Sequence, residues 1–162
     1  MRQDVAVQQA FVFEKVAVVV SPWHEPMDPP ERGARVEVRL VADEPRRGSP
    51  SAAQRVVLDQ PVFRADLFDQ AGGPPGNLRS AHVHPYFDGV EPSDRVWHDD
   101  IQRDPTGWLG SELDDLHGLL ERGGVDVAEA SWLEADAAAV RAAVPVVVAA
   151  VEAAWKEARR GQ

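Results

Sequence analysis

Hydrophobic and polar residues alternate along much of the first hundred residues, a pattern typical of β-strands with one apolar and one polar face. Residues 34–42 show it most clearly, because Val36 and Val38 are flanked by single charged residues. Residues 11–20 form a longer apolar run that also favours a strand. The segment 21–33 contains four prolines and is expected to be a loop, since proline cannot donate a hydrogen bond within a sheet. Further strands are expected over residues 54–58, 62–68 and 78–87.

The spacing of apolar residues changes to a helical period in the C-terminal part of the chain. Asp104 followed by Pro105 is typical of a helix start, and leucines then recur at helical spacing until a Gly-Gly pair ends the pattern. A second helix is expected after Ser131, where a capping box precedes an apolar stripe. Pro145 lies within that stripe and is expected to kink or divide the helix. The stripe consists of Val140, Val144, Val147, Val148, Val151 and Trp155.

Strands followed by helices predict an α+β fold. We expect an antiparallel sheet of about four to six strands in the N-terminal ~100 residues, covered on its apolar face by two C-terminal helices. Residues 1–100 are the strand-rich part and residues 104–160 the helical part. A chain of 162 residues has the size of one ordinary domain, so a single domain over residues 1–162 is expected.

Composition and charge narrow the function classes. The chain has no cysteine, which excludes disulfides, thiolate metal sites and a catalytic thiol. Its formal net charge of −10 argues against binding to a nucleic-acid backbone, which needs clustered basic residues. No stretch approaches 18 consecutive apolar residues, so we expect a cytoplasmic protein that does not enter the membrane. The preference for Arg over Lys, with many Ala, Gly and Pro residues, favours a bacterial source.

The chain has only five histidines, yet His82 and His84 stand two apart in the sequence RSAHVHPYF. Residues two apart on a strand point to the same face of a sheet. If this strand pairs with the preceding one as a hairpin, Arg64 and Asp66 lie within cross-strand reach of the two histidines. The helices are expected on the other face, which would leave this polar face open to solvent or to a ligand. Three residues of an earlier strand are expected to join it, namely Arg35, Glu37 and Arg39.

Two imidazoles in this arrangement suit a divalent metal ion. His82 and His84 would supply nitrogen ligands, and Asp66 or Asp88 a carboxylate ligand. His98, which follows Trp97 in a segment rich in acidic residues, is a further candidate ligand. A metal with an open coordination position would lower the pKa of a bound water and allow hydrolysis.

The same side chains offer chemistry without a metal. A histidine polarised by a neighbouring carboxylate can act as a general base, and an arginine can hold a phosphate or carboxylate substrate. The candidate catalytic residues are Arg64, Asp66, His82 and His84.

The segment GNLRSAHVHPYFD resembles the first half-motif of the cupins, in which a glycine precedes two histidines and an acidic residue. Cupins are small β-barrels that hold a metal with histidine and glutamate side chains. The resemblance implies a metal at His82 and His84, with Asp88 where cupins have glutamate. It covers about thirteen residues and the second cupin motif does not follow, so it indicates a test for metal and not a barrel fold.

Two functions from different classes follow from these patterns. The first is a non-enzymatic protein-interaction module, in which the polar face or the Pro-rich segment 21–33 binds a partner protein or a second copy of the chain. The alternative is a metal- or His-dependent, hydrolase-like enzyme that uses the face carrying His82 and His84. The same face could also be a hydrogen-bonded patch in contact with solvent, with neither role.

Overall fold

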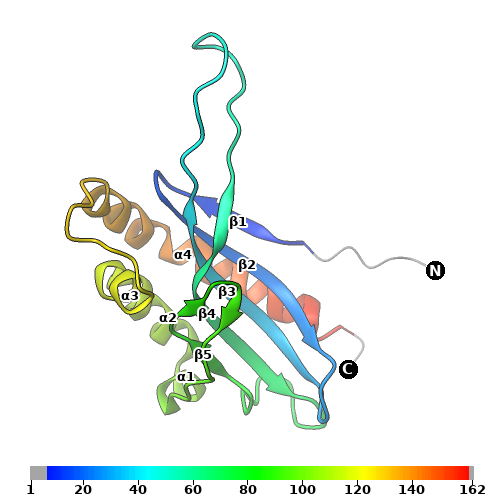
Figure 1. Cartoon of the computed structure of the whole chain (residues 1–162). Helices are drawn as coiled ribbons and strands as arrows, with labels where there is room; N and C mark the ends of the chain where they lie inside the picture. Colours follow the sequence, from blue (N-terminus) through cyan, green and yellow to red (C-terminus); the bar gives the residue numbers. More distant parts are fainter. Residues whose placement is uncertain (1–6, 161–162) are drawn as a thin grey trace.

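The computed structural model describes residues 7–160 and shows an α+β fold, as the sequence predicts (Figure 1). All pairings in the main sheet are antiparallel, and its strand order follows the sequence from β1 to β5. Two further short strands form a separate hairpin. The strands of the main sheet are β1 (Gln9–Val12), β2 (Val16–Glu25), β3 (Glu31–Val41), β4 (Leu58–Gln70) and β5 (His82–His84), and those of the small hairpin are β6 (Phe87–Asp88) and β7 (Glu91–Pro92).

The N-terminal strands differ from the sequence prediction at two places. The run 11–20 is not one strand, because the chain turns at residues 13–15 and β1 folds back on β2. Most of the segment 21–33 is not a loop, because β2 and β3 remain paired as far as Glu25 and Glu31. The proline at position 22 is tolerated because β1 pairs with β2 only as far as Val20, so β2 has one open side on which the missing N–H costs no ladder bond.

The predicted helical part, residues 104–160, contains three helices instead of two, and a further short helix over Asp99–Arg103 precedes it. The leucine-rich segment divides at Asp115, whose side chain accepts a hydrogen bond from the Gly118 amide and begins a new helix. The last helix is continuous through Pro145, which is exposed, so the carbonyl group that loses its partner can face water. The helices are α1 (Asp99–Arg103), α2 (Pro105–Asp114), α3 (Leu116–Arg122) and α4 (Leu133–Ala158).

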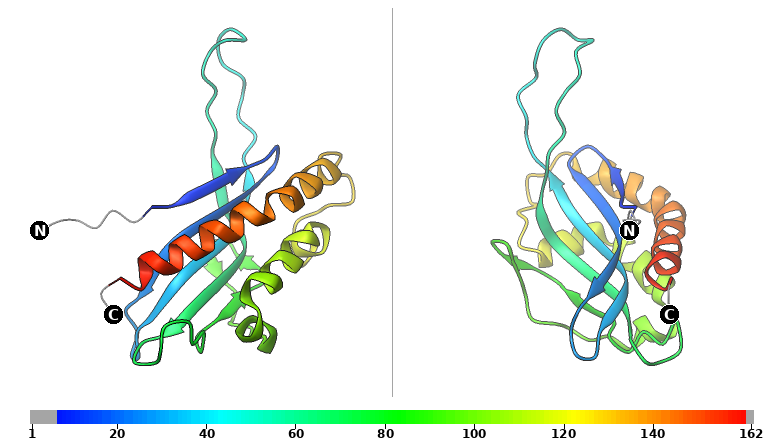
Figure 2. Two further views of the ribbon diagram at one scale, coloured as in Figure 1. Left: turned by 180° about the vertical axis from the view of Figure 1, so that it is seen from behind. Right: turned by 90° about the vertical axis from the view of Figure 1, so that its right-hand side faces the viewer.

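The hydrophobic core lies between the sheet and the helices, with α4 packed against β2 and β3 (Figure 2). Val140, Val147 and Val151 of the predicted stripe are fully buried there. Trp155 is anchored at the end of the stripe, where its indole N–H donates to the Leu67 carbonyl at 2.9 Å. By length and composition α4 could also cross a membrane, but in this structure its apolar stripe faces the sheet.

A long arm, residues 42–57, connects β3 to β4 and projects away from the rest of the molecule (Figure 1). Its base is closed by the hydrogen bond from the Ala42 amide to the Val57 carbonyl, at 2.8 Å. The predicted strand 54–58 falls mainly in this arm, because β4 begins at Leu58. The predicted strand 78–87 is also shorter than expected and is reduced to β5 and the start of β6.

Candidate metal centre

The pairing of β4 with β5 places the four candidate residues side by side. Asp66 stands opposite His82, and Arg64 stands opposite His84. This register confirms the predicted hairpin and the predicted cross-strand proximity. The alternation of side chains sends these four residues to the face opposite α4, which we call the polar face.

The polar face is buried, contrary to the expectation that it is open to solvent. The side chain of Asp66 is 2% exposed, that of His82 is 1% exposed and that of His84 is 9% exposed. A covering segment, residues 86–97, folds back over this face and carries the β6–β7 hairpin, on the side of the sheet away from α4 (Figure 2).

The covering segment is attached to the polar face at several points. The Trp97 ring lies 5.4 Å from the His82 ring, centroid to centroid. Val96 exchanges two backbone hydrogen bonds with Val83, which extends the sheet by one bridge beyond β5. Arg95 forms a two-point ion pair with Glu31 at 2.8 and 3.0 Å. These contacts join different segments of the chain, so the cover could not be predicted from the alternation within single strands.

Backbone carbonyl groups fix the orientation of both imidazoles. His82 Nδ1 lies 2.7 Å from the Ser80 carbonyl, and His84 Nδ1 lies 2.6 Å from the Ser93 carbonyl. A carbonyl oxygen can only accept, so each Nδ1 carries a hydrogen and donates it. In the neutral imidazole the other nitrogen, Nε2, is then an unprotonated lone pair. Both Nε2 atoms point to Asp66 Oδ2, at 3.3 Å from His82 and 3.7 Å from His84.

Asp66 remains ionised in this environment. Burial by itself would raise the pKa of its carboxyl group, but hydrogen bonds from His82, His84 and Arg35 and the positive charge of Arg35 outweigh it. The net result is a pKa well below the usual range for an aspartate. Arg35 donates to both carboxylate oxygens, at 2.7 Å to Oδ1 and 3.1 Å to Oδ2. An imidazole that donates to Asp66 from Nε2 as well as to a carbonyl group from Nδ1 carries a proton on both nitrogens, whereas a neutral one turns a lone pair toward the carboxylate and leaves room for a metal ion. In either case a cation completes the arrangement.

That cation is either a proton on the imidazoles or a metal ion. The Asp66, His82 and His84 ligand atoms lie within 4.8 Å of one another. Bonds of about 2.0–2.1 Å to a tetrahedral zinc ion separate neighbouring ligands by about 3.3 Å, close to the two measured separations. Each histidine also donates its Nδ1–H to a backbone carbonyl group. Metal-ligating histidines almost always donate the hydrogen of their non-ligating ring nitrogen to an acceptor in this way. The geometry can therefore hold a transition-metal ion.

The remaining polar residues hold the site in place. The Arg35 guanidinium stacks on the Trp23 ring at 3.8 Å from its centroid, which fixes the partner of Asp66. Arg64 donates to Glu37 from Nε at 3.1 Å and from a terminal nitrogen at 2.9 Å. The Arg64 guanidinium also lies 5.0 Å from the Phe87 ring of the covering segment. Arg64 is thus engaged with Glu37 and is not placed as an anion clamp beside Asp66.

Two candidate metal ligands lie outside the group. Asp88 is exposed in the β6–β7 hairpin and is not one of the side chains that lie close enough to the histidines to share an ion. His98 is also exposed and stands at the start of α1, where its ring lies 5.9 Å from that of Trp108. Within residues 7–160, Asp66 is the only side chain that lies close enough to the two histidines to share an ion with them. The acid of the group thus comes from the paired strand and not from the cupin-like position, and the sheet is open and not a barrel.

Sequence reasoning missed the residues of the covering segment. Trp97 and Ser93 contact the two histidines, but neither follows a strand-like or helical period that would place it there. A weak signal is the clustering of aromatic and charged residues just after the histidine pair, which is unusual for a solvent loop.

Comparison with known proteins gives no match: no protein-family model, no curated protein and no solved structure is similar to the chain. The function is therefore inferred from the geometry of the site.

Proposed function

We propose that the protein binds one divalent transition-metal ion through Asp66, His82 and His84. The observation that carries this proposal is the convergence of two imidazole Nε2 atoms on one carboxylate oxygen, with both Nδ1 atoms held by backbone carbonyls. Two nitrogen ligands and one oxygen ligand suit zinc and its neighbours in the first transition row better than magnesium or calcium.

The burial of the group favours a metal that stabilises the fold over a metal that acts on a substrate. A catalytic ion needs a coordination position that a substrate can reach. The three side chains here are at most 9% exposed, and the Trp97 ring lies against His82. The ion would join β4 to β5 and, through Ser93 and His84, to the covering segment. The proposed role is thus structural, and it differs from the hydrolase-like alternative.

The test is metal binding by protein purified without chelator and without an affinity-tag metal. We expect close to one equivalent of zinc, and a Co²⁺ derivative whose visible spectrum reports a nitrogen and oxygen ligand set. His82→Ala should weaken binding by at least about 100-fold, because outer hydrogen-bond partners alone are worth 10–100-fold. His117→Ala is the matched control, since the His117 side chain is 61% exposed and outside the group.

The result that would contradict the proposal is equal metal binding by the His82→Ala and His117→Ala proteins, or no binding below about 1 mM. If His82→Ala does not fold, His84→Gln removes the other nitrogen ligand at the more exposed of the two histidines. That variant must also lose the metal. Quenching of Trp97 fluorescence by Ni²⁺, absent in Trp97→Phe, would place the ion beside His82.

A second candidate function is protein binding by the arm, residues 42–57. The arm projects beyond the sheet, and Val56 within it is 63% exposed, so it offers an apolar residue to another chain (Figure 1). Chemical crosslinking from a cysteine placed at Ser51 should capture a partner or a second copy of the chain. A crosslinking pattern identical to that from a cysteine at exposed Glu152 would contradict this function.

A further inference from the structure

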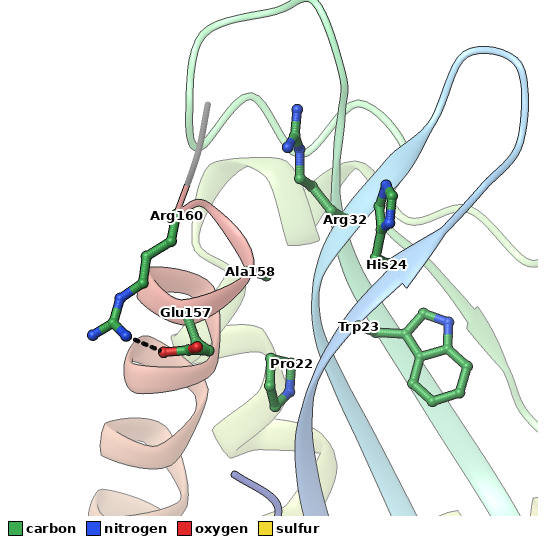
Figure 3. Close-up of a pocket in the computed structure, with 7 residues that line it drawn as sticks. All are labelled: Pro22, Trp23, His24, Arg32, Glu157, Ala158 and Arg160. Carbon is green, nitrogen blue, oxygen red and sulfur yellow. Dashed lines mark ion pairs between the residues drawn. The ribbon is translucent and has the colours of Figure 1, made fainter. Parts of the chain in front are cut away.

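A cavity of about 610 Å³ lies away from the metal centre, where the end of α4 meets the β2–β3 hairpin (Figure 3). Pro22, His24 and Arg32 line it from the two strands, and Glu157 and Arg160 line it from the end of α4. The register pairs His24 directly with Arg32, so their side chains stand next to each other on the face of the sheet that α4 covers.

Arg32 carries the feature that points to a ligand. Its Nε is buried and has no hydrogen-bond partner among the described residues. A buried donor without a partner destabilises the protein, so native structures rarely keep one unless a water, ion or ligand completes it. Across the sheet Arg32 pairs in register with Asp69, a buried acid that could have neutralised it.

Asp69 does not serve Arg32 because its oxygens are already engaged. Arg159 donates to the Asp69 carboxylate at 2.8 and 3.3 Å. The backbone amides of Gly76 and Leu78 donate to the same carboxylate at 2.9 and 3.1 Å. The charge of Arg32 is therefore left for a group that enters the cavity.

The charges around the cavity favour an anion. Arg160 forms an ion pair with Glu157 at 2.9 Å, so these two lining residues cancel each other (Figure 3). Arg32 then leaves a net positive charge in the cavity, although the chain as a whole has a formal charge of −10. His24 adds a ring N–H donor beside it. A guanidinium and an imidazole side by side are a common way to hold the oxygens of a carboxylate or phosphate.

We propose that this cavity binds a small organic anion, whose carboxylate or phosphate oxygens are held by Arg32 and His24. The cavity volume falls in the range of about 300–1,000 Å³ typical of small-molecule sites, so it has room for more than the oxyanion. Pro22 and Ala158 provide apolar surface for the rest of the ligand. This site is separate from the metal centre, because the side chains of Pro22, His24 and Arg32 point to the other face of the sheet, and Trp23, which also borders the cavity, carries its ring to the polar face.

The test uses phenyl phosphate and benzoate as probes, with the Arg32 Nε–H resonance in ¹H–¹⁵N spectra as the readout. At least one probe should shift this resonance in a saturable way. Arg32→Gln should weaken binding of that probe by at least about tenfold, because a charge-assisted hydrogen bond is lost. Arg46→Gln is the matched control: it removes the same charge from an exposed position in the arm and should change the affinity less than about twofold.

Each outcome decides the question. Binding of phenyl phosphate alone would assign the ligand to the phosphate class, and binding of benzoate alone to the carboxylate class. No saturable shift with either probe up to about 10 mM would overturn the proposal. Equal weakening in the two variants would overturn it too, because the effect would then be one of net charge. If Arg32→Gln fails to fold, two other measurements decide the question. The first is the shift of the Nε–H resonance in the unmodified protein, and the second is the affinity of Arg32→Lys for the probe, since that variant keeps the charge and loses Nε.

Discussion

Asp66 is the residue on which the polar face depends. Its carboxylate accepts two hydrogen bonds from Arg35, and its Oδ2 faces the Nε2 atoms of both histidines. The side chain is 2% exposed. A buried carboxylate with a buried guanidinium is costly to separate, because removing one partner leaves the other charge without compensation. Asp66 therefore matters for folding in the absence of metal as well as for metal binding.

We expect Asp66→Asn to lower the free energy of unfolding of the metal-free protein by about 3–5 kcal/mol near pH 7, because the buried Arg35 loses its hydrogen-bonded carboxylate and keeps only Glu25, whose Oε2 lies 3.9 Å away. Asp88→Asn, at an exposed position, should change it by less than about 0.5 kcal/mol. Urea denaturation monitored by circular dichroism measures both. A cost below about 1 kcal/mol for Asp66→Asn would show that water reaches Arg35.

The pH dependence of the same pair of proteins gives a second check on this prediction. The pKa of Asp66 is lowered on folding, so its contribution to stability is fully present above the unfolded pKa of about 3.9 and is lost as pH falls through the folded pKa. The difference in stability between the original protein and Asp66→Asn should thus shrink as the pH falls below about 4. A difference that grows below that pH would contradict this sign.

At the scale of elements, Asp136 joins α4 to the β1–β2 hairpin. Its carboxylate accepts hydrogen bonds from the backbone N–H groups of Glu14, Lys15 and Val16, at 3.0, 2.8 and 3.0 Å. The residue is 2% exposed, so water does not replace these bonds. The sequence contains a signal for this role, because Asp136 interrupts the apolar side of the helix between Leu133 and Val140. A charged residue at such a position indicates a buried partner. Here the partner is the turn at residues 13–15, which the sequence prediction missed because it treated residues 11–20 as one strand.

We expect Asp136→Ala to reduce the free energy of unfolding by about 3–5 kcal/mol, since three backbone donors lose a charged acceptor at once. Glu152→Ala is the control, because Glu152 lies on the same helix with an exposed side chain and should cost less than about 0.5 kcal/mol. Thermal and urea unfolding measure both variants. Similar losses in the two would mean that the turn at residues 13–15 finds other acceptors.

The elements also show which parts of the fold the sequence could predict. Alternation placed Asp66 and His82 on one face and paired their strands correctly, because both signals are local. It could not predict the covering segment, whose main anchor joins Arg95 to Glu31, 64 positions apart in the chain. For the same reason the polar face was expected to be wet. The charged side chains of the polar face are instead paired with one another, and a charge can be buried only when it has such a partner.

At the scale of the whole molecule, the sheet separates two environments. One face meets α4 and contains the hydrophobic core, and at its end lies the cavity lined by Arg32. The other face holds the buried ion pairs and the candidate metal site beneath the covering segment. Trp23 and His24 are adjacent in β2 and point to opposite faces, so β2 takes part in both.

The arm lies outside both environments, and we expect it to be dispensable for folding. Ala42 and Val57 already hydrogen-bond at its base, and Val41 pairs with Leu58 just below it. Replacing residues 43–56 by Asn-Gly would close this end as a two-residue hairpin. The ion pair of Lys15 with Asp43 is lost, but Asp43 is 90% exposed and such pairs contribute little.

We expect the free energy of unfolding of the shortened protein to stay equal or to rise by about 1 kcal/mol, because a shorter connection costs less chain entropy. Metal binding should be unchanged, since the proposed ligands lie on β4 and β5, outside the arm. Shortening the β2–β3 hairpin by residues 22–32 is the informative contrast, because those residues are mostly paired and their loss should unfold the chain. A loss above about 2 kcal/mol from removing the arm would show that its contacts belong to the fold, and the arm would then be a poor candidate for a surface kept for a partner.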